Sequence, residues 1–104
     1  MTVNTIGASE VHVDAEGFLT QYDEWSEDLA RQLAAQIGIG LTNVHLNVIR
    51  ILREDYLATG ETATIRRISA LTLIPVKDLF ALFPGKPGKK MAYIAGLPKP
   101  RGCV

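Results

Sequence analysis

Hydrophobic residues recur every three to four positions through most of the chain beyond its first quarter. This spacing places them on one face of an α-helix. Three such helices are expected to begin at hydroxyl-bearing residues suited to capping a helix start, namely Ser26, Thr42 and the region around Thr62. Two more are expected to begin near Pro75 and Pro87, because proline is tolerated in the first helical turn. The pattern therefore predicts five mostly short helices.

The same spacing predicts which side chains are buried. Trp25 is expected to pack against the first helix, and His45 to pack or form hydrogen bonds rather than to take part in catalysis. The adjacent acids Glu27-Asp28 and Glu54-Asp55 diverge around a helix and are interpreted as solvated surface. The expected apolar stripes contain, in chain order, Leu29, Ala30, Leu33, Ala34, Ile37, Val44, Val48, Ile49, Leu52, Tyr56, Ile65, Ile68, Leu71, Val76, Leu79, Phe80, Phe83, Met91, Ile94 and Ala95.

The first part of the chain has a different pattern. Residues 2–5 and 10–13 alternate between apolar and polar side chains, which predicts a β-hairpin. Two strands alone are marginally stable, so the hairpin must lean on the helices. The predicted fold class is α+β, mostly α: a small orthogonal bundle of about five helices with an N-terminal β-hairpin and an extended C-terminal arm. We expect a helical domain over residues 1–95 and a flexible arm over residues 96–104.

The predicted arm carries the single cysteine of the sequence, Cys103. Pro98 and Pro100 lack backbone donors and favour extended geometry, which predicts a semi-stiff arm. Gly96 makes a plausible cap for the last helix, and Gly102 provides a loose joint beside the thiol. Free cysteine is among the most buried residue types, so its place on an exposed arm indicates a function.

Positive charge lies close to this thiol along the chain. Lys99 and Arg101 favour the thiolate, which is the nucleophilic form of cysteine. The terminal carboxylate on Val104 acts in the opposite direction. A mobile thiol is the main chemical group that the sequence supplies.

Composition excludes several classes of protein. The 104 residues suit a single domain with a modest core. The sequence shows no membrane span and no secretion leader. A single cysteine can form neither a disulfide within the fold nor a zinc-binding motif. Together these features favour a reducing, cytoplasmic setting. It also contains no phosphate-binding glycine loop, no metal cluster and no recognisable nucleophile–base pair. We therefore expect no cofactor and no stand-alone catalytic activity.

Charge is distributed unevenly along the chain. Up to Glu61 there are ten acidic residues and three arginines, and beyond it eight lysines and arginines with one acid, so the halves carry −7 and +7. The basic half could steer an acidic partner or bind RNA. Alternatively, the two halves simply attract each other in the fold.

The run Ala95-Gly96-Leu97-Pro98-Lys99-Pro100, closing in Gly102-Cys103-Val104, resembles the C-terminal arm of the DsrC/TusE family. The similarity extends over nearly the whole chain after the first few residues. Other matches occur in the family's order: Val13-Asp14-Ala15-Glu16-Gly17-Phe18-Leu19, Trp25, Leu41-Thr42, His45, Leu52-Arg53, Tyr56, Ile65-Arg66 and Leu82-Phe83-Pro84.

This resemblance implies a cytoplasmic sulfur carrier of the sulfurtransferase type rather than a stand-alone catalyst. Cys103 would accept sulfane sulfur as a persulfide and pass it to an acceptor protein, in tRNA thiolation or in sulfur oxidation metabolism. Arg66, Lys99 and Arg101 would bind the persulfide or a partner, and donor and acceptor proteins would dock the arm. Relatives that cycle through an internal disulfide carry a second cysteine where this sequence has Ala92, so the resemblance is to the single-cysteine branch.

Two other functions remain open from the sequence. Residues 65–83, with Arg66, Arg67 and Lys77, could form a helix-turn-helix that binds nucleic acid through the basic half. Alternatively, Cys103 could form a mixed disulfide with a partner, which would make the protein a redox adaptor.

Overall fold

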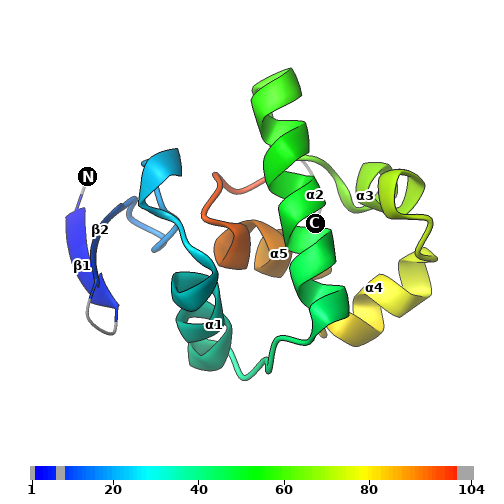
Figure 1. The fold of residues 1–104 in the computed structure, drawn as a ribbon, viewed down its shortest axis with the longest axis horizontal. Coiled ribbons are helices and arrows are strands. Elements are labelled where there is room, and N and C mark those ends of the chain that lie inside the picture. The colour runs from blue at the N-terminus through cyan, green and yellow to red at the C-terminus, as the bar shows by residue number, and fades with distance from the viewer. Residues whose placement is uncertain (1, 7–8, 101–104) are drawn as a thin grey trace.

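A computed structural model describes residues 2–6 and 9–100, and the predicted fold class is confirmed (Figure 1). A two-stranded antiparallel hairpin is followed by a short 3-10 turn and five α-helices. The elements are β1 Thr2–Ile6, β2 Ser9–Val13, the 3-10 turn Tyr22–Glu24, α1 Glu27–Gln36, α2 Asn43–Thr59, α3 Ile65–Thr72, α4 Val76–Leu82 and α5 Pro87–Ala95. None of the helices in the described ranges is long and apolar enough to cross a bilayer.

The helix starts follow the predicted capping chemistry, with one difference. The Ser26 hydroxyl accepts a hydrogen bond from the Leu29 amide at 3.1 Å, and Thr42 forms a capping box with His45. The third helix begins later than predicted, because Thr64 rather than Thr62 caps it. The Thr62 hydroxyl instead donates to the Pro98 carbonyl at 2.7 Å.

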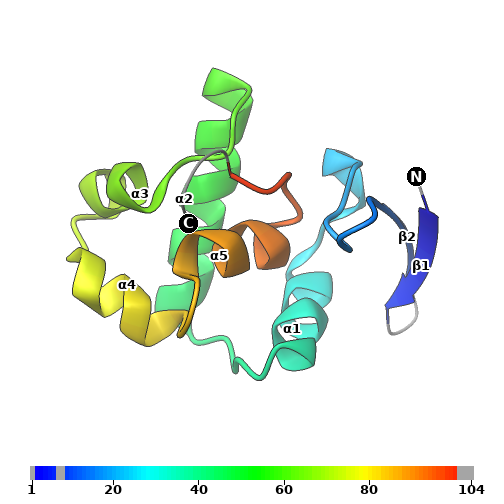
Figure 2. The same cartoon turned by 180° about the vertical axis from the view of Figure 1, so that it is seen from behind.

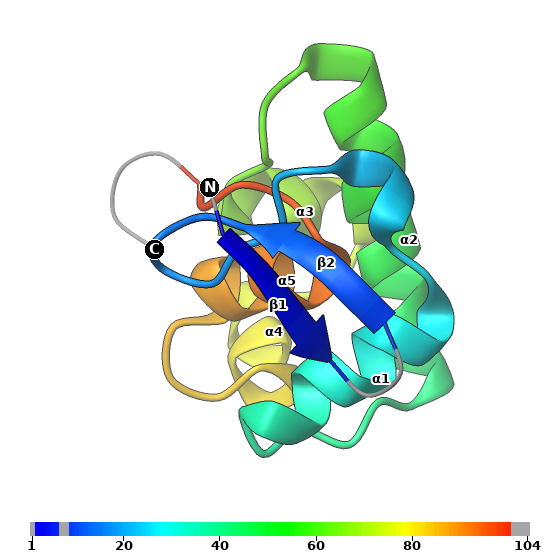
Figure 3. The same cartoon turned by 90° about the vertical axis from the view of Figure 1, so that its left-hand side faces the viewer.

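Helix α2 is the central element of the fold. It packs against α5 along one side and against α3 near its C-terminal end, and α4 continues from α3 (Figures 1 and 2). Helix α1 lies between α5 and the hairpin, and Figure 3 shows the two strands crossing in front of the helices. The hairpin therefore leans on the bundle, as its marginal intrinsic stability requires.

The interior contains two clusters of buried apolar side chains. The larger is built around α2 and includes Ile49 and Leu52, with Leu97 from beyond the last helix. The smaller joins the hairpin to α1 through Val13 and Leu29. Trp25 packs against both clusters, which confirms its predicted place in the core and connects the sheet to the bundle.

Three residues expected in the apolar stripes are exposed. Val44, Leu71 and Phe80 are 51%, 44% and 48% exposed, so their predicted burial is wrong. In α2, His45 occupies the inner position, because its Nε2 atom lies 2.8 Å from the Leu82 carbonyl and its Nδ1 atom contacts Thr42. A polar side chain whose ring nitrogens both have partners can be buried at little cost.

Two helices end at glycines with left-handed backbone conformations. Gly60 closes α2 at φ +76°, and Gly96 closes α5 at φ +69°. An added Cβ atom would meet nothing within 4 Å at Gly60. At Gly96 it would lie 2.8 Å from Cδ1 of Trp25 and 3.2 Å from Cδ2 of Leu19.

This contrast gives a matched pair of variants. Gly60→Ala is expected to lower the free energy of unfolding by about 1 kcal/mol, the cost of a left-handed backbone for an L-residue. Gly96→Ala is expected to lower it by at least about 1 kcal/mol more, because Trp25 must also shift. Urea denaturation measures both values, and equal losses would contradict the close packing at Gly96.

Candidate functional site

The structure describes part of the predicted site. Cys103, Arg101 and Gly102 lie outside the described residues, whereas Lys99 and Arg66 lie within them. We define residues 96–100 as the base of the arm; these residues and those that contact them form the described part of the site. The division into a domain and a flexible arm stays a prediction.

The base of the arm begins with a tight helix end. The amide of Gly96 donates to the Tyr93 carbonyl at 3.3 Å, and the amide of Leu97 donates to the Ala92 carbonyl at 3.0 Å. These two bonds form a Schellman motif, which satisfies carbonyls at the end of a helix. The Leu97 side chain is completely buried in the larger core cluster. The first residues of the arm are thus part of the folded core.

Arg53, which sequence reasoning did not select as a site residue, closes the same helix end from α2. Its Nη1 atom donates to the Ala95 carbonyl at 2.8 Å, and its Nη2 atom donates to the Tyr22 carbonyl at 3.1 Å. The guanidinium carbon lies 3.8 Å from the ring centroid of Tyr22 and 4.2 Å from that of Trp25. Arginine suits this place because its planar group can stack on rings and donate at its edges together.

Burial lowers the pKa of Arg53 from its ordinary value, while the nearby Tyr22 and Asp23 raise it. The guanidinium remains protonated at physiological pH, because its ordinary pKa lies far above that range. A charged group therefore caps the negative end of α5 from the side, where a helix favours positive charge.

Trp25 completes the closure of α5. Its indole nitrogen donates to the Ile94 carbonyl at 2.8 Å. The last carbonyls of a helix have no partner within it, and here two of them accept hydrogen bonds from side chains of other segments. Trp25 and Arg53 together fix the point from which the arm leaves the fold. The arginine next to Leu52 in an apolar stripe was the sequence feature that could have indicated this role.

Beyond Leu97, polar contacts hold the base of the arm on two sides. The Pro98 carbonyl accepts a hydrogen bond from Thr62, and the Lys99 ammonium lies 3.2 Å from a carboxylate oxygen of Glu16. Figure 2 shows this segment leaving α5 and passing toward the loop before α3. Both partners of the ion pair are about half exposed, so the pair contributes under about 1 kcal/mol. The base is thus held by core packing at Leu97 and by exposed polar contacts at Pro98 and Lys99, and Pro100 is buried again.

Local chain geometry places Glu16 at this position. The Asp14 side chain accepts hydrogen bonds from the amides of Glu16 and Phe18 at 2.9 and 3.0 Å. This arrangement forms a compact turn of the type that aspartate favours. Gly17 adopts φ +90° within it. The turn presents Glu16 outward, toward Lys99.

The two arginines at the start of α3 differ in their surroundings. Arg66 is exposed, and it makes no ion pair within the part of the chain that the structure describes. Arg67 forms a bidentate contact with Asp55, in which Nε and Nη2 lie 2.9 and 2.6 Å from the carboxylate oxygens. This hydrogen bonding raises the pKa of Arg67.

The interpretation of Asp55 as solvated surface is therefore wrong, whereas that of Glu54 is correct. Asp55 is 8% exposed and uses its carboxylate to join α2 to α3. Sequence neighbours on a helix point in different directions, so one acid can face solvent and the next can face a neighbouring helix. The pair fixes the loop of residues 60–64, which also contacts the arm through Thr62.

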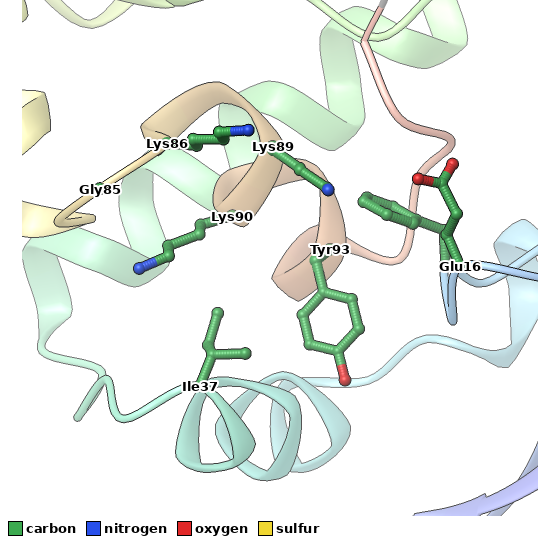
Figure 4. Close-up of a pocket in the computed structure, with 8 residues that line it drawn as sticks. Glu16, Ile37, Gly85, Lys86, Lys89, Lys90 and Tyr93 are labelled. Atoms are coloured by element: carbon green, nitrogen blue, oxygen red, sulfur yellow. The ribbon is translucent and has the colours of Figure 1, made fainter.

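Residues of the base of the arm line a pocket of about 240 Å³, which Pro98 and Lys99 share with Tyr56, Thr62 and Thr64, and a smaller one of about 70 Å³. A third pocket, of about 580 Å³, contains no residue of the arm but is lined by three lysines and by Glu16, the partner of Lys99 (Figure 4). Among the residues that the structure describes, no group of three His, Cys, Asp or Glu side chains could hold a metal ion.

The helix pair expected over residues 65–83 is present as α3 and α4. Leu73 joins them with a left-handed backbone, φ +61°. Of the cations assigned to this hypothetical nucleic-acid surface, Arg67 is paired with Asp55, while Arg66 and Lys77 are exposed. Binding of nucleic acid stays a prediction.

Comparison with known proteins gives consistent results. The protein family described as "DsrC like protein" matches residues 5–104. "Sulfurtransferase TusE" of Sodalis glossinidius is 37% identical over 103 residues, which cover 92% of this chain and 95% of that protein. "Sulfite reductase, dissimilatory-type subunit gamma" of Nitratidesulfovibrio vulgaris is 34% identical over 101 residues, or 96% of each chain. The NMR structure of Allochromatium vinosum DsrC superposes with a TM-score of 0.84 at 33% identity, covering 99% of this chain and 100% of that one.

The closure of α5 can be tested with two arginines on the same helix. Arg53→Lys is expected to lower the free energy of unfolding by about 1–3 kcal/mol, because lysine cannot stack on two rings and also satisfy the buried Ala95 carbonyl and the partly buried Tyr22 carbonyl. Hydrogen exchange at the Gly96 and Leu97 amides should accelerate at least about tenfold.

Arg50→Lys is the matched control, because Arg50 is exposed on α2 and contacts the carboxylate of Glu27. Its expected change in unfolding free energy is within about 0.5 kcal/mol. If Arg53→Lys changed the free energy of unfolding as little as Arg50→Lys, the side-chain closure of α5 would not stabilise the base of the arm.

Proposed function

Because this chain belongs to the DsrC-like family, we propose that it is a sulfur carrier whose Cys103 holds sulfane sulfur as a persulfide during a relay between proteins. The names of the relatives, a sulfurtransferase and a sulfite reductase subunit, support a role in sulfur relay. The observation that carries the proposal is the single cysteine, Cys103, on a proline-containing arm that directly follows the rigidly closed end of α5.

The proposed transfer of sulfane sulfur requires no oxidant or reductant. The Cys103 thiolate attacks the outer sulfur of a donor persulfide, the sulfur–sulfur bond of the donor breaks, and the donor leaves as a thiolate. Cys103 then carries the terminal sulfur, and an acceptor thiolate attacks that sulfur in the same way and releases the Cys103 thiolate. Each step follows the logic of thiol–disulfide exchange. No electrons are gained or lost overall.

The single cysteine restricts this mechanism to exchange between molecules. Position 92 is alanine, so the chain cannot form an internal disulfide with Cys103. Ala92 is completely buried, and its carbonyl accepts a hydrogen bond from the Leu97 amide. In this chain, position 92 therefore supports the base of the arm. The sulfur held by Cys103 is transferred to an acceptor protein instead of being released by an internal disulfide.

The contacts at the base of the arm support a fixed position at Leu97 and a releasable one at Lys99. Leu97 is buried in the core, whereas Lys99 is held by an ion pair exposed to water. Releasing Lys99 from Glu16 would provide an ammonium group for anionic sulfur on Cys103. We propose that Lys99 and Arg101 stabilise the thiolate or persulfide, and that the exposed Arg66 contributes to partner or persulfide binding.

The partners that we propose are a persulfide donor protein and an acceptor protein in the reducing cytoplasm. A reducing setting fits a chain whose one cysteine must stay free to react. Both tRNA thiolation and sulfur oxidation metabolism fit this chemistry. The relatives are named a sulfurtransferase, TusE, and a gamma subunit of a dissimilatory-type sulfite reductase, and both names fit a role in sulfur transfer.

Intact mass spectrometry tests sulfur carriage directly. After reduction and incubation with a small-molecule persulfide donor, the wild-type protein is expected to gain the mass of one sulfur atom. A reductant should remove the added mass, because persulfide sulfur is exchangeable with thiols. The Cys103→Ser variant should show no gain, since the chain contains no other cysteine.

Alkylation of Cys103 in the same sample shows whether the thiol is accessible. An accessible thiol that gains no sulfur from several donors would argue against carriage. A mixed disulfide with a partner protein, formed without added sulfur, would instead favour the redox adaptor.

A further inference from the structure

The 580 Å³ pocket opens between α1, α5 and the turn that carries Glu16 (Figure 4). Its apolar wall consists of Phe18, Ile37 and Tyr93. The rings of Phe18 and Tyr93 meet edge to face with their centroids 5.8 Å apart, and the Tyr93 hydroxyl donates to Gln36 on α1 at 2.9 Å. Burial raises the pKa of Tyr93, so this wall is uncharged at neutral pH. The wall is rigid and suited to an apolar or aromatic group.

The opposite side of the pocket carries Lys86, Lys89 and Lys90 at the start of α5. The first turn of this helix contains no acidic residue, and its start has no side-chain cap. Cations at the positive end of a helix are unfavourable. A bound anion would relieve this effect.

Contacts within the protein do not neutralise these lysines. In the described ranges, Lys86 and Lys89 make no ion pair, and the Lys90 ammonium donates to the carbonyl of Pro84. Glu16 is the acid that lines the pocket, and it is already paired with Lys99. The pocket therefore presents a net positive charge beside an apolar wall.

We propose that this pocket is a docking site for an acidic segment of a partner protein, with an apolar or aromatic side chain anchored against Tyr93. This inference rests on the proposed function, because the partner that docks here is one that exchanges sulfur with the arm. The pocket and the base of the arm share Glu16, so a protein that binds in the pocket lies next to the arm. The positive pocket also accounts for part of the basic charge of the C-terminal half.

The directions of the lysines favour a peptide segment over a small phosphorylated molecule. Figure 4 shows the Lys89 side chain pointing toward the side of Glu16, while Lys90 points away from it. A single phosphate is bound best by donors that converge on one point. Ammonium groups spread around an opening instead match several carboxylates along a chain, which also increase the rate of association.

The test uses a synthetic peptide of acidic residues around one central phenylalanine, titrated into the reduced, unloaded wild-type protein. The peptide is expected to bind with a dissociation constant below about 1 mM at low salt. Amide shifts in the NMR spectrum should be concentrated at residues 85–93 and in the turn at 14–18. Replacing the phenylalanine of the peptide by alanine should weaken binding several-fold, because the anchor loses its contact with the wall.

Two charge reversals provide a matched comparison. Lys89→Glu is expected to weaken peptide binding at least about tenfold, because a like charge then faces the segment. Lys77→Glu makes the same change in net charge on the exposed surface of α4 and should weaken binding less than about threefold. Glu16→Gln should strengthen binding or leave it unchanged, since it removes the negative charge of the pocket.

Equal losses of peptide affinity in Lys89→Glu and Lys77→Glu would overturn the proposal, because binding would then depend on the net charge of the protein alone. Tighter binding of ADP than of the peptide, with shifts at the same residues, would also overturn it and assign the pocket to a small molecule. Peptide binding is measured without sulfur loading, and loading is measured by intact mass without peptide. Failure of the docking site is therefore distinguishable from failure of sulfur carriage.

Discussion

The rest of the structure depends on how the C-terminal end of α5 is closed. Two carbonyls at this end, those of Ile94 and Ala95, accept hydrogen bonds from Trp25 and Arg53, which come from the segment before α1 and from α2. A buried carbonyl without a partner is costly, so these donors stabilise both the helix and its position against α2. Gly96 makes the closure possible, because a side chain there would collide with Trp25. This junction thus joins the segment before α1, the central helix α2 and the base of the arm.

This junction fixes the start of the arm, and other contacts hold the residues that follow. The chain is fixed by core packing at Leu97, and beyond it by a hydrogen bond from Thr62 and an ion pair between Lys99 and Glu16. Such exposed polar contacts are weak and can exchange with water or with groups of another protein. For the proposed carrier, this arrangement fixes the point where the arm leaves the fold, while the exposed contact between Lys99 and Glu16 can be exchanged for groups of a partner. The lysine-lined pocket adjoins the same ion pair, so docking and presentation of the arm would take place on one face.

The thiol of the proposed site, and the shape expected of the segment that carries it, follow from the chain itself. Cys103 is the single thiol, and prolines on its N-terminal side indicate an extended arm irrespective of the fold. The contacts of the arm were not predictable, because they join residues far apart in sequence. Arg53 and Ala95 are 42 positions apart, and Glu16 and Lys99 are 83 positions apart. Arg53 resembles any charged residue at the edge of an apolar stripe until Tyr22, Trp25 and the end of α5 are placed around it. The pocket escaped sequence reasoning for the same reason, since Phe18, Ile37 and Tyr93 come from three separate segments.

The sequence by itself determined the number of helices, most of their ends and the hairpin, because caps, prolines, glycines and apolar spacing act within a few residues. It also determined the chemistry available, one cysteine and no second thiol at position 92. Only the tertiary structure decided which side chains the helices bury. Val44, Leu71 and Phe80 face solvent, while His45 and Asp55 are buried, because burial depends on which partner helix lies opposite and on whether a polar group finds a hydrogen-bonding partner there. Periodicity defines a face of a helix, but the neighbouring elements define how much of that face is covered.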